Sequence, residues 1–231
     1  MLTDNTNIIN LLLSRGWTDM GCGSDVEPYS TRWCECLSEG IRDKTSYNII
    51  DWGCGYARFL LHIIKKGNVN TTRYFGFELQ GKTHGELLID FCRENYSHLD
   101  MKEGSSIKFG YVDNEELVKE AKNKCTTMLL GSVFTHLSLE SSKAIINRFD
   151  DFIVNGGEIV FSLILSANNI DKQEVQGVYE NSDCFAIVYY SYDSLNALSF
   201  SNGEHRYKIE QVSVFQTDHG VKQDIFRLTI N

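Results

Sequence analysis

The sequence predicts an α/β protein with a mostly parallel sheet and an antiparallel hairpin at its C-terminus. Between residues 47 and 165, short apolar segments alternate with helical patterns of roughly 10–15 residues, as in βαβ units. Glu210–Gln216 and Asp224–Ile230 then alternate apolar and polar residues on the two sides of a short segment that contains Gly220. A period of two is typical of paired antiparallel strands. A doubly wound parallel sheet is therefore expected to end in a hairpin.

The alternating part of the chain divides into strands and helices in order. The last parallel strand is entered through a predicted turn at Gly156-Gly157. The predicted strands are Tyr47–Trp52, Thr72–Glu78, Ile107–Val112, Thr126–Ser132 and Glu158–Leu165. The predicted helices are Ala57–Lys66, His84–Tyr96, Asn114–Asn123 and Leu139–Val154.

Residues 1–45 precede this alternation and form a predicted N-terminal helical cap. Helices are predicted at Asn5–Ser14 and at about Ser30–Ile41, joined by a glycine-rich segment. The cap either packs as a flap beside the sheet or forms a lid over a ligand cleft, with Trp17 or Tyr29 touching the ligand. Residues 46–231 complete a single domain, in which the polar and mixed segment at about 166–206 is an insertion.

Composition and charge exclude several classes of protein. A chain of 231 residues can bury a substantial core, and its net charge of −9 offers no general attraction to nucleic acid or to an anionic membrane. No signal peptide is visible, and no apolar stretch approaches the roughly 20 residues that span a bilayer. The seven cysteines form no CxxC pair, so no metal site is predicted. We expect a reduced, cytoplasmic protein without membrane insertion; its oligomeric state is not readable.

The segment from Tyr47 to Arg58 is the clearest candidate for a cofactor cradle. It reads as a strand that ends near Asp51, a turn built on Gly53 and Gly55, and the start of a helix. Glycine can adopt backbone angles that other residues avoid, and it lets a ligand lie against the main chain. The N–H groups at the start of the helix are available to an acceptor.

Three observations bear on which cofactor this cradle holds. A dinucleotide fingerprint requires G-x-G-x-x-G, and Arg58 stands where its third glycine belongs. Glu78 ends the second strand, where a carboxylate can accept hydrogen bonds from ribose hydroxyls of a nicotinamide or an adenosyl cofactor. Asp113 follows the third strand, where a carboxylate can accept from an adenine amino group. Alternatively, Asp113 caps the helix that begins before Glu115-Glu116.

These segments together resemble the class I S-adenosylmethionine-dependent methyltransferases. The first motif of that family resembles Asp51-Trp52-Gly53-Cys54-Gly55-Tyr56-Ala57, its two acidic residues fall on Glu78 and Asp113, and its fourth strand resembles Met128–Leu137. The likeness covers about residues 47–165 by motif and the hairpin by pattern. Ala57 replaces the usual glycine, and Thr126-Thr127 stand where an acidic residue is frequent.

The resemblance implies a Rossmann-like, mostly parallel seven-stranded sheet and S-adenosyl-L-methionine as cofactor. It implies methyl transfer to a small polar acceptor, with O-methylation favoured and the segment 166–206 binding the acceptor. Phe134–Leu137 and Lys222–Asp224 are similar to methyltransferases that act on sugars of bacterial surface polysaccharides. The implied cofactor-binding residues are Asp51, Gly53, Cys54, Gly55, Glu78, Leu79, Asp113, Ser132 and Val133.

His136 is the candidate general base, because an imidazole titrates near neutral pH and the segment 131–137 is expected to face the reacting methyl group. Alternatively, His136 caps or supports the helix that starts at Ser138. Tyr179, Tyr190 and His205 are the candidate acceptor-binding residues; alternatively, the tyrosines pack in the interior and the histidine is merely exposed. Two other functions stay open, a nicotinamide-dependent oxidoreductase and a cofactor-binding subunit without catalytic activity.

Overall fold

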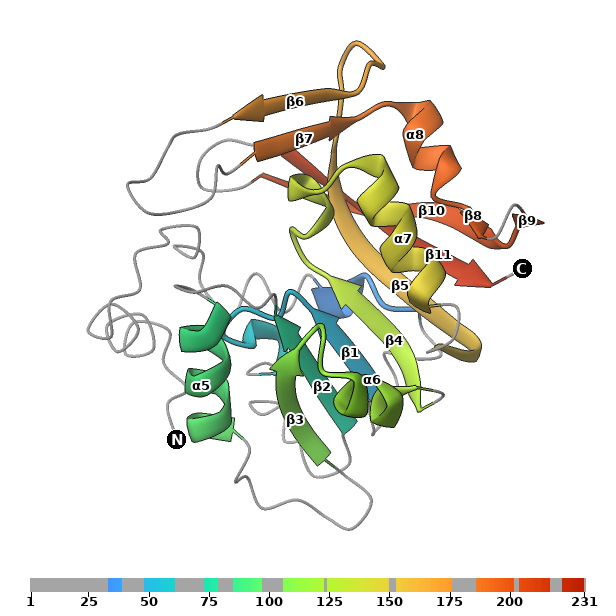
Figure 1. Cartoon of the computed structure of the whole chain (residues 1–231). Coiled ribbons are helices and arrows are strands. Elements are labelled where there is room, and N and C mark those ends of the chain that lie inside the picture. The colour runs from blue at the N-terminus through green and yellow to red at the C-terminus, as the bar shows by residue number, and fades with distance from the viewer. Residues whose placement is uncertain are drawn as a thin grey trace. The chain divides into compact units, whose positions relative to one another are not determined.

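The computed structural model of the chain consists of two compact units, residues 1–121 and residues 122–231 (Figure 1). The structure describes residues 33–38, 48–60, 73–78, 85–96, 106–122, 124–149, 153–175, 186–201, 204–216 and 222–230.

The first unit contains three parallel strands, β1 (Asn48–Trp52), β2 (Arg73–Glu78) and β3 (Ser106–Tyr111). In the register of these strands Asp51 lies opposite Gly76 and Glu78 lies opposite Tyr111. β1 and β2 are almost entirely buried, as expected of parallel strands that are covered on both faces, and half of the residues of β3 are buried. Because parallel strands end at the same edge, the residues that follow them are brought to one side of the sheet.

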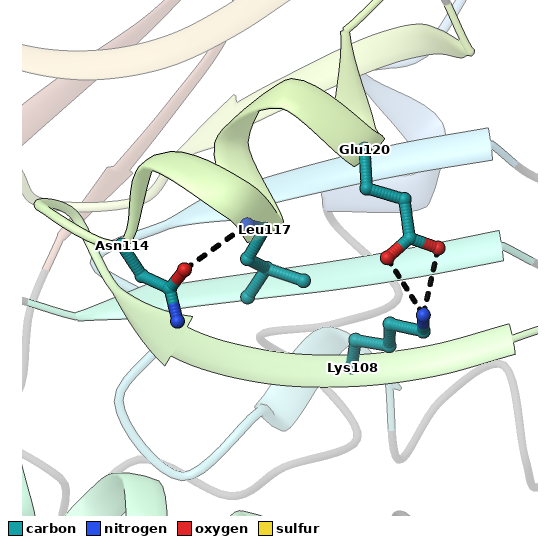
Figure 2. Close-up of polar contacts among 4 residues, drawn as sticks. All are labelled: Lys108, Asn114, Leu117 and Glu120. Atoms are coloured by element: carbon teal, nitrogen blue, oxygen red, sulfur yellow. Dashed lines mark hydrogen bonds and ion pairs between the residues drawn. The ribbon is translucent and has the colours of Figure 1, made fainter.

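Two helices of the first unit cover opposite faces of β3. On one face the Phe109 ring lies 6.1 Å from the ring of Tyr96, the last residue of α5 (Gly85–Tyr96). On the other face Lys108 Nζ contacts both carboxylate oxygens of Glu120, each at 2.7 Å, in α6 (Glu115–Ala121) (Figure 2). Side chains of neighbouring strand residues point to opposite faces, which explains this division.

The second unit is organised around the long strand β5 (Ile153–Leu165). β4 (Cys125–Leu130) pairs with it in parallel, and β11 (Lys222–Ile230) pairs with it antiparallel. β10 (Tyr207–Gln216) forms the antiparallel hairpin with β11, as the sequence predicts. The rings of Phe134, Phe161 and Phe226 pack in sequence, with centroid separations of 5.0 and 5.8 Å.

The predicted insertion forms additional structure beside β5. β7 pairs in parallel with the end of β5, and β6 pairs antiparallel with β7. Its elements are β6 (Lys172–Val175), β7 (Ala186–Tyr190), α8 (Tyr192–Ala197), β8 (Phe200–Ser201) and β9 (Glu204–His205).

One predicted boundary in the second unit is wrong. The helix after β4 was expected to reach Val154, but α7 (Leu139–Phe149) ends earlier and β5 begins at Ile153. Gly156-Gly157 is not a turn, because it lies within β5 where the pairing with β4 is irregular. Between two consecutive pairs of that register, β5 advances by more residues than β4, which is a bulge that glycine accommodates.

The fold class expected from the sequence is confirmed: parallel strands alternate with helices, and the chain ends in an antiparallel hairpin. In the predicted cap, residues 33–35 are helical, and Trp33, Cys36 and Leu37 are buried. The predicted helix at 5–14, the residues Trp17 and Tyr29, and the predicted boundary after residue 45 lie outside the described residues. Within the described parts, no helix is both long and apolar enough to cross a membrane.

Candidate functional site

The turn that follows β1 has an unusual backbone. Gly53, Gly55 and Ala57 all have positive φ, at 72°, 53° and 62°. This left-handed region is costly for residues with a Cβ, so the two glycines adopt it freely, whereas Ala57, which is fully buried, adopts it under strain. A Cβ at Gly55 would meet no atom of the described chain within 4 Å. On the side where a Cβ of Gly55 would stand, the described residues therefore leave open space.

The turn is fastened to β2 by hydrogen bonds. The N–H groups of Gly53 and Cys54 both donate to the Phe77 carbonyl, at 2.8 and 3.0 Å. The Gly55 N–H donates to Glu78 Oε2 at 2.9 Å. The two predicted cofactor-binding features, the glycine turn and the carboxylate that ends β2, are thus joined directly.

Gly76 makes this close approach possible. A Cβ at Gly76 would lie 2.6 Å from Cδ1 of the Phe109 ring and 3.1 Å from Cys54 Sγ. A separation of 2.6 Å is well inside van der Waals contact, so a side chain at this position would displace the ring or the turn. Close packing against Phe109 and Cys54 therefore explains why position 76 is a glycine.

Asp51 is a buried carboxyl group with one hydrogen-bond donor among the described residues. Its side chain is 7% exposed, and the Tyr74 hydroxyl donates to Oδ2. Burial raises the pKa of Asp51 to about 6, and the nearby Glu78 carboxylate acts in the same direction, while the Tyr74 hydroxyl and Arg58 oppose the shift. A buried carboxylate with a free oxygen is a favourable partner for a positively charged ligand group.

Two thiols lie beneath the turn. Cys54 Sγ is 3.6 Å from the Gly55 carbonyl oxygen, and Cys92 Sγ of α5 is 3.5 Å from the same atom. The hydrogen bond with Cys92, together with burial, holds the pKa of Cys54 well above its ordinary value. Cys54 is therefore a neutral thiol that packs within the turn.

Asp113 lies in the turn after β3 and is exposed. Among the described residues it has no hydrogen-bond or ionic partner. The N-terminal cap of α6 is provided by Asn114, whose Oδ1 accepts from the Leu117 N–H at 3.0 Å (Figure 2). The alternative role of Asp113 as the helix cap is thus filled by its neighbour. Leu79 lies outside the described residues.

In the second unit, Ser132 is held in a strained conformation at the end of β4. Its φ is 60°, and each of its polar groups has a partner. Its N–H donates to Ser162 Oγ at 2.8 Å, its hydroxyl donates to Gln223 Oε1 at 3.2 Å, and its carbonyl accepts from Thr135 Oγ1 at 2.6 Å. Strained backbone that the surroundings fix in this way is frequent at functional sites. Val133, the next residue, is half-buried.

His136 ends the 3₁₀ turn η2 (Phe134–His136) and is exposed. The N-terminal cap of α7 belongs to Ser138, whose Oγ accepts from the Ser141 N–H at 3.2 Å. The capping role that was the alternative for His136 is therefore filled by Ser138. The roles of His136 as a base and as a support for this helix both stay predictions.

Tyr190 is buried in the second unit, where its hydroxyl group connects β7 to the segment that precedes α7. Its side chain is 1% exposed, and its hydroxyl donates to the Leu137 carbonyl at 2.6 Å and lies 2.7 Å from Ser142 Oγ. Burial raises the pKa of Tyr190 to about 12. Its predicted contact with the acceptor stays a prediction, as does that of His205, whose backbone lies in β9. Tyr179 lies outside the described residues.

Sequence reasoning missed Tyr74, Ser162 and Gln223. All three support a predicted site residue from a neighbouring strand, and each lies in a segment that reads as an ordinary strand. Gln223 was noted only within a tripeptide that resembles sugar-modifying enzymes. No local pattern marks such partners, because the contact depends on strand register.

No protein-family model and no curated protein matches this sequence. Several solved structures, however, are similar in fold. An S-adenosylmethionine-dependent methyltransferase from Methanosarcina mazei matches with a TM-score of 0.58 at 13% identity, over 84% of this chain and 98% of that one. Magnesium protoporphyrin IX methyltransferase from Synechocystis PCC 6803, solved with bound S-adenosylmethionine, matches with a TM-score of 0.56 at 11% identity, over 89% and 78% of the two chains.

A third similar structure is 1,6-didemethyltoxoflavin-N1-methyltransferase from Burkholderia thailandensis. It contains bound 1,6-didemethyltoxoflavin and S-adenosylhomocysteine. The TM-score is 0.55 at 12% identity, and the match covers 87% of this chain and 78% of that chain. The strands, the hairpin and these likenesses together identify the fold of this chain as that of the class I S-adenosylmethionine-dependent methyltransferases.

Proposed function

We propose that this chain is an S-adenosylmethionine-dependent methyltransferase that acts on a small polar acceptor, with transfer to oxygen favoured. The observation that carries the proposal is the buried carboxylate of Asp51 beside the left-handed glycine turn. One of its oxygens is held by Tyr74, and no described residue donates to the other. The methionine half of the cofactor carries an ammonium group that matches this oxygen in charge and in hydrogen bonding.

The other residues of the first unit fit the remaining parts of the same cofactor. Glu78 is half-buried and suits the ribose hydroxyls, and the exposed Asp113 suits the adenine amino group. The open space over Gly55 suits a ligand that lies against the main chain. Bound S-adenosylmethionine supplies a methyl group that its sulfonium already activates.

A nicotinamide-dependent oxidoreductase is the competing enzyme class, and the charges at the turn oppose it. A dinucleotide places a negatively charged pyrophosphate at the glycine turn. Here the Glu78 carboxylate lies close enough to Asp51 to disfavour the ionisation of Asp51. Two acidic groups favour a cationic ligand over an anionic one. A cofactor-binding subunit without activity stays the third possibility.

Isothermal titration calorimetry with S-adenosylhomocysteine and with NADH separates these functions. We expect S-adenosylhomocysteine to bind with a micromolar dissociation constant and NADH to give no heat. The proposal would be overturned if NADH alone gave heat, or if neither compound gave heat.

Substitution of Glu78 tests its assignment to the ribose. Glu78→Gln keeps an acceptor for the Gly55 N–H but removes the charge, so we expect it to weaken S-adenosylhomocysteine binding by about tenfold. Glu116→Gln, which changes an exposed carboxylate on α6, is the matched control and should leave the affinity unchanged. Equal affinities for both variants would remove Glu78 from the site.

His136 is proposed to take the proton of the acceptor hydroxyl during transfer. Its test requires an acceptor, which radiolabelled methyl transfer into fractionated lysate can supply. His136→Ala should then reduce turnover by about 10²-fold or more and remove the acidic limb of the pH profile, without changing the affinity for S-adenosylhomocysteine. Ser138→Ala removes the cap of α7 and controls for a structural disturbance of the same segment. If His136→Ala keeps the wild-type pH profile, His136 is structural.

We propose a small molecule as the methyl acceptor. The similar structures include one enzyme named for magnesium protoporphyrin IX and one with bound didemethyltoxoflavin, which supports a small-molecule acceptor here. The insertion beside β5 is the segment we assign to the acceptor, with Tyr179, Tyr190 and His205 as candidates. A sugar or a polysaccharide precursor, and a cytoplasmic location, stay predictions from the sequence.

A further inference from the structure

A tyrosine of the first unit holds the candidate ammonium-binding carboxylate. Tyr74 lies on β2, 23 residues from Asp51, and its hydroxyl donates to Asp51 Oδ2. Both side chains are buried, at 0% and 7% exposure. The Tyr74 ring is packed at 5.7 Å from the Phe109 ring, which limits the positions that its hydroxyl can adopt.

We propose that Tyr74 is a positioning residue for the cofactor: its hydroxyl fixes one oxygen of Asp51, so that the other oxygen and the negative charge are presented to the cofactor's ammonium group. This inference rests on the proposed function, because it specifies how the site recognises the methionine half. It adds a residue that neither the glycine turn nor the acidic strand ends identify.

The Tyr74 hydroxyl fixes the orientation of the Asp51 carboxylate. A carboxylate at the end of a strand can rotate about its last bond unless a partner fixes it. Burial and the adjacent Asp51 carboxylate hold the pKa of Tyr74 well above its ordinary value, so the hydroxyl keeps its proton and acts as a permanent donor. Because this donor occupies Oδ2, the oxygen left for a ligand is Oδ1.

The Tyr74 hydroxyl also favours the ionised form of Asp51. The groups that act on Asp51 are Tyr74 and Glu78 from β2 and Arg58 after the turn. The thiols of Cys54 and Cys92, the latter from α5, act on Tyr74. Burial and Glu78 favour the neutral acid, whereas Tyr74 and Arg58 favour the carboxylate. Loss of the Tyr74 hydroxyl therefore shifts this balance toward the neutral acid, which cannot pair with an ammonium group.

A consequence is that binding of the methionine half depends on pH. Below about pH 6 Asp51 holds a proton in the free protein, and an ammonium ligand must displace it. The affinity should then fall by up to about tenfold for each further pH unit. Above this range the carboxylate is already ionised, so the affinity should level off.

The test is calorimetry of S-adenosylhomocysteine between pH 5 and pH 8.5 with the whole chain and with Tyr74→Phe. The variant keeps the ring, so the packing against Phe109 is retained. We expect the midpoint of the pH dependence to rise by about one unit, the affinity at pH 6 to fall about fivefold, and the affinity at pH 8.5 to stay within about twofold of the wild type.

Tyr96→Phe is the matched control. Tyr96 is also fully buried and also packs against Phe109, but its hydroxyl has no hydrogen-bond partner among the described residues. Its removal should leave the affinity and its pH dependence unchanged. A shift of the same size in Tyr96→Phe would show a general packing effect and overturn the proposal.

5′-Methylthioadenosine, which has no amino-acid half, separates the remaining outcomes. Its binding should be independent of pH and insensitive to Tyr74→Phe. An equal loss for both ligands at every pH would make Tyr74 structural, and an unchanged profile would remove it from the site. If the variant does not fold, Asp51→Asn replaces it and must abolish the pH dependence. Failure of wild-type protein to bind S-adenosylhomocysteine at all would instead reject the proposed function.

Discussion

The burial of the Asp51 carboxyl group lowers the stability of the folded chain at neutral pH. Its folded-state pKa is about 6, against an ordinary value of 3.8. Below about pH 4 the folded and unfolded chains both hold the proton, so there is no penalty. As the pH rises to 6, the unfolded chain releases the proton while the folded chain retains it, and the free energy of unfolding falls. Above about pH 6 the penalty is complete, at about 3 kcal/mol.

Asp51→Asn should therefore stabilise the protein in a pH-dependent manner. The amide oxygen can still accept from Tyr74, and the group no longer ionises. We expect the free energy of unfolding to rise by up to about 3 kcal/mol at pH 7.5 and to be unchanged at pH 3.5. Urea titrations at the two pH values measure this, with Asp113→Asn, at an exposed position, as the control. An effect of equal size at both pH values would contradict the assigned cause.

The residues of the site differ in how far the sequence reveals them. Gly53, Gly55 and Glu78 were predictable, because a turn and a strand end have local signatures. Ala57 was predictable only as a small residue, and its positive φ appears only in the structure. Tyr74 and Gln223 were not predictable, because each contacts its partner through strand register across 23 and 91 residues. Local patterns identify the residues that touch a ligand better than those that hold them in place.

At the scale of elements, two glycines in neighbouring strands allow a matched experiment. A Cβ at Gly76 or at Gly110 would come within 2.6 Å of another side chain. At Gly76 the obstacle is the rigid Phe109 ring, with Cys54 Sγ close by at 3.1 Å; at Gly110 it is the flexible end of Leu117. We expect Gly76→Ala to destabilise the protein by about 2–3 kcal/mol and Gly110→Ala by less than about 1 kcal/mol. Equal effects in thermal or urea unfolding would contradict this account.

The errors in the predicted element boundaries have a common cause. Phe152 and Ile153 continue the apolar spacing of α7, so the helical pattern extends past its end at Phe149. Pairing with β4 instead draws Ile153 into β5, and this tertiary contact overrides the local preference. The cap of α6 shows the same limit at a smaller scale: Asp113 and Asn114 are both good caps, and only the structure assigns the cap to Asn114. The first four parallel strands were predicted within two residues, whereas β10 begins three residues before its predicted start at Glu210.

At the scale of the whole molecule, the sequence and the similar structures identify the fold but not the methyl acceptor. The order of motifs along the chain predicted the fold, which the solved structures support over 84% or more of this chain. Their identities of 11–13% are too low to transfer an acceptor. The insertion also differs from the sheet in kind, because its short strands and α8 have no period that a sequence pattern could assign. The cofactor is therefore the property of the whole chain that can be tested first.

Binding of this cofactor should be visible in the stability of the intact chain. A ligand that binds only the folded state, at a free concentration one hundred times its dissociation constant, stabilises that state by about 2.7 kcal/mol. For a chain of 231 residues this corresponds to a rise in Tm of roughly 5–10 °C. We expect S-adenosylhomocysteine to produce such a rise at pH 8. At the same ligand concentration the rise should be smaller at pH 5, where Asp51 is protonated.

Differential scanning fluorimetry at both pH values measures this, with Asp51→Asn as the comparison. In that variant the rise in Tm should be smaller at pH 8 and no longer depend on pH, because the group that pairs with the ammonium is permanently neutral. NADH at the same concentration should leave Tm unchanged, since its pyrophosphate would meet the Asp51 carboxylate at the glycine turn. A pH-independent rise with the wild-type chain would mean that the ammonium group is bound elsewhere, even if the cofactor itself is correct.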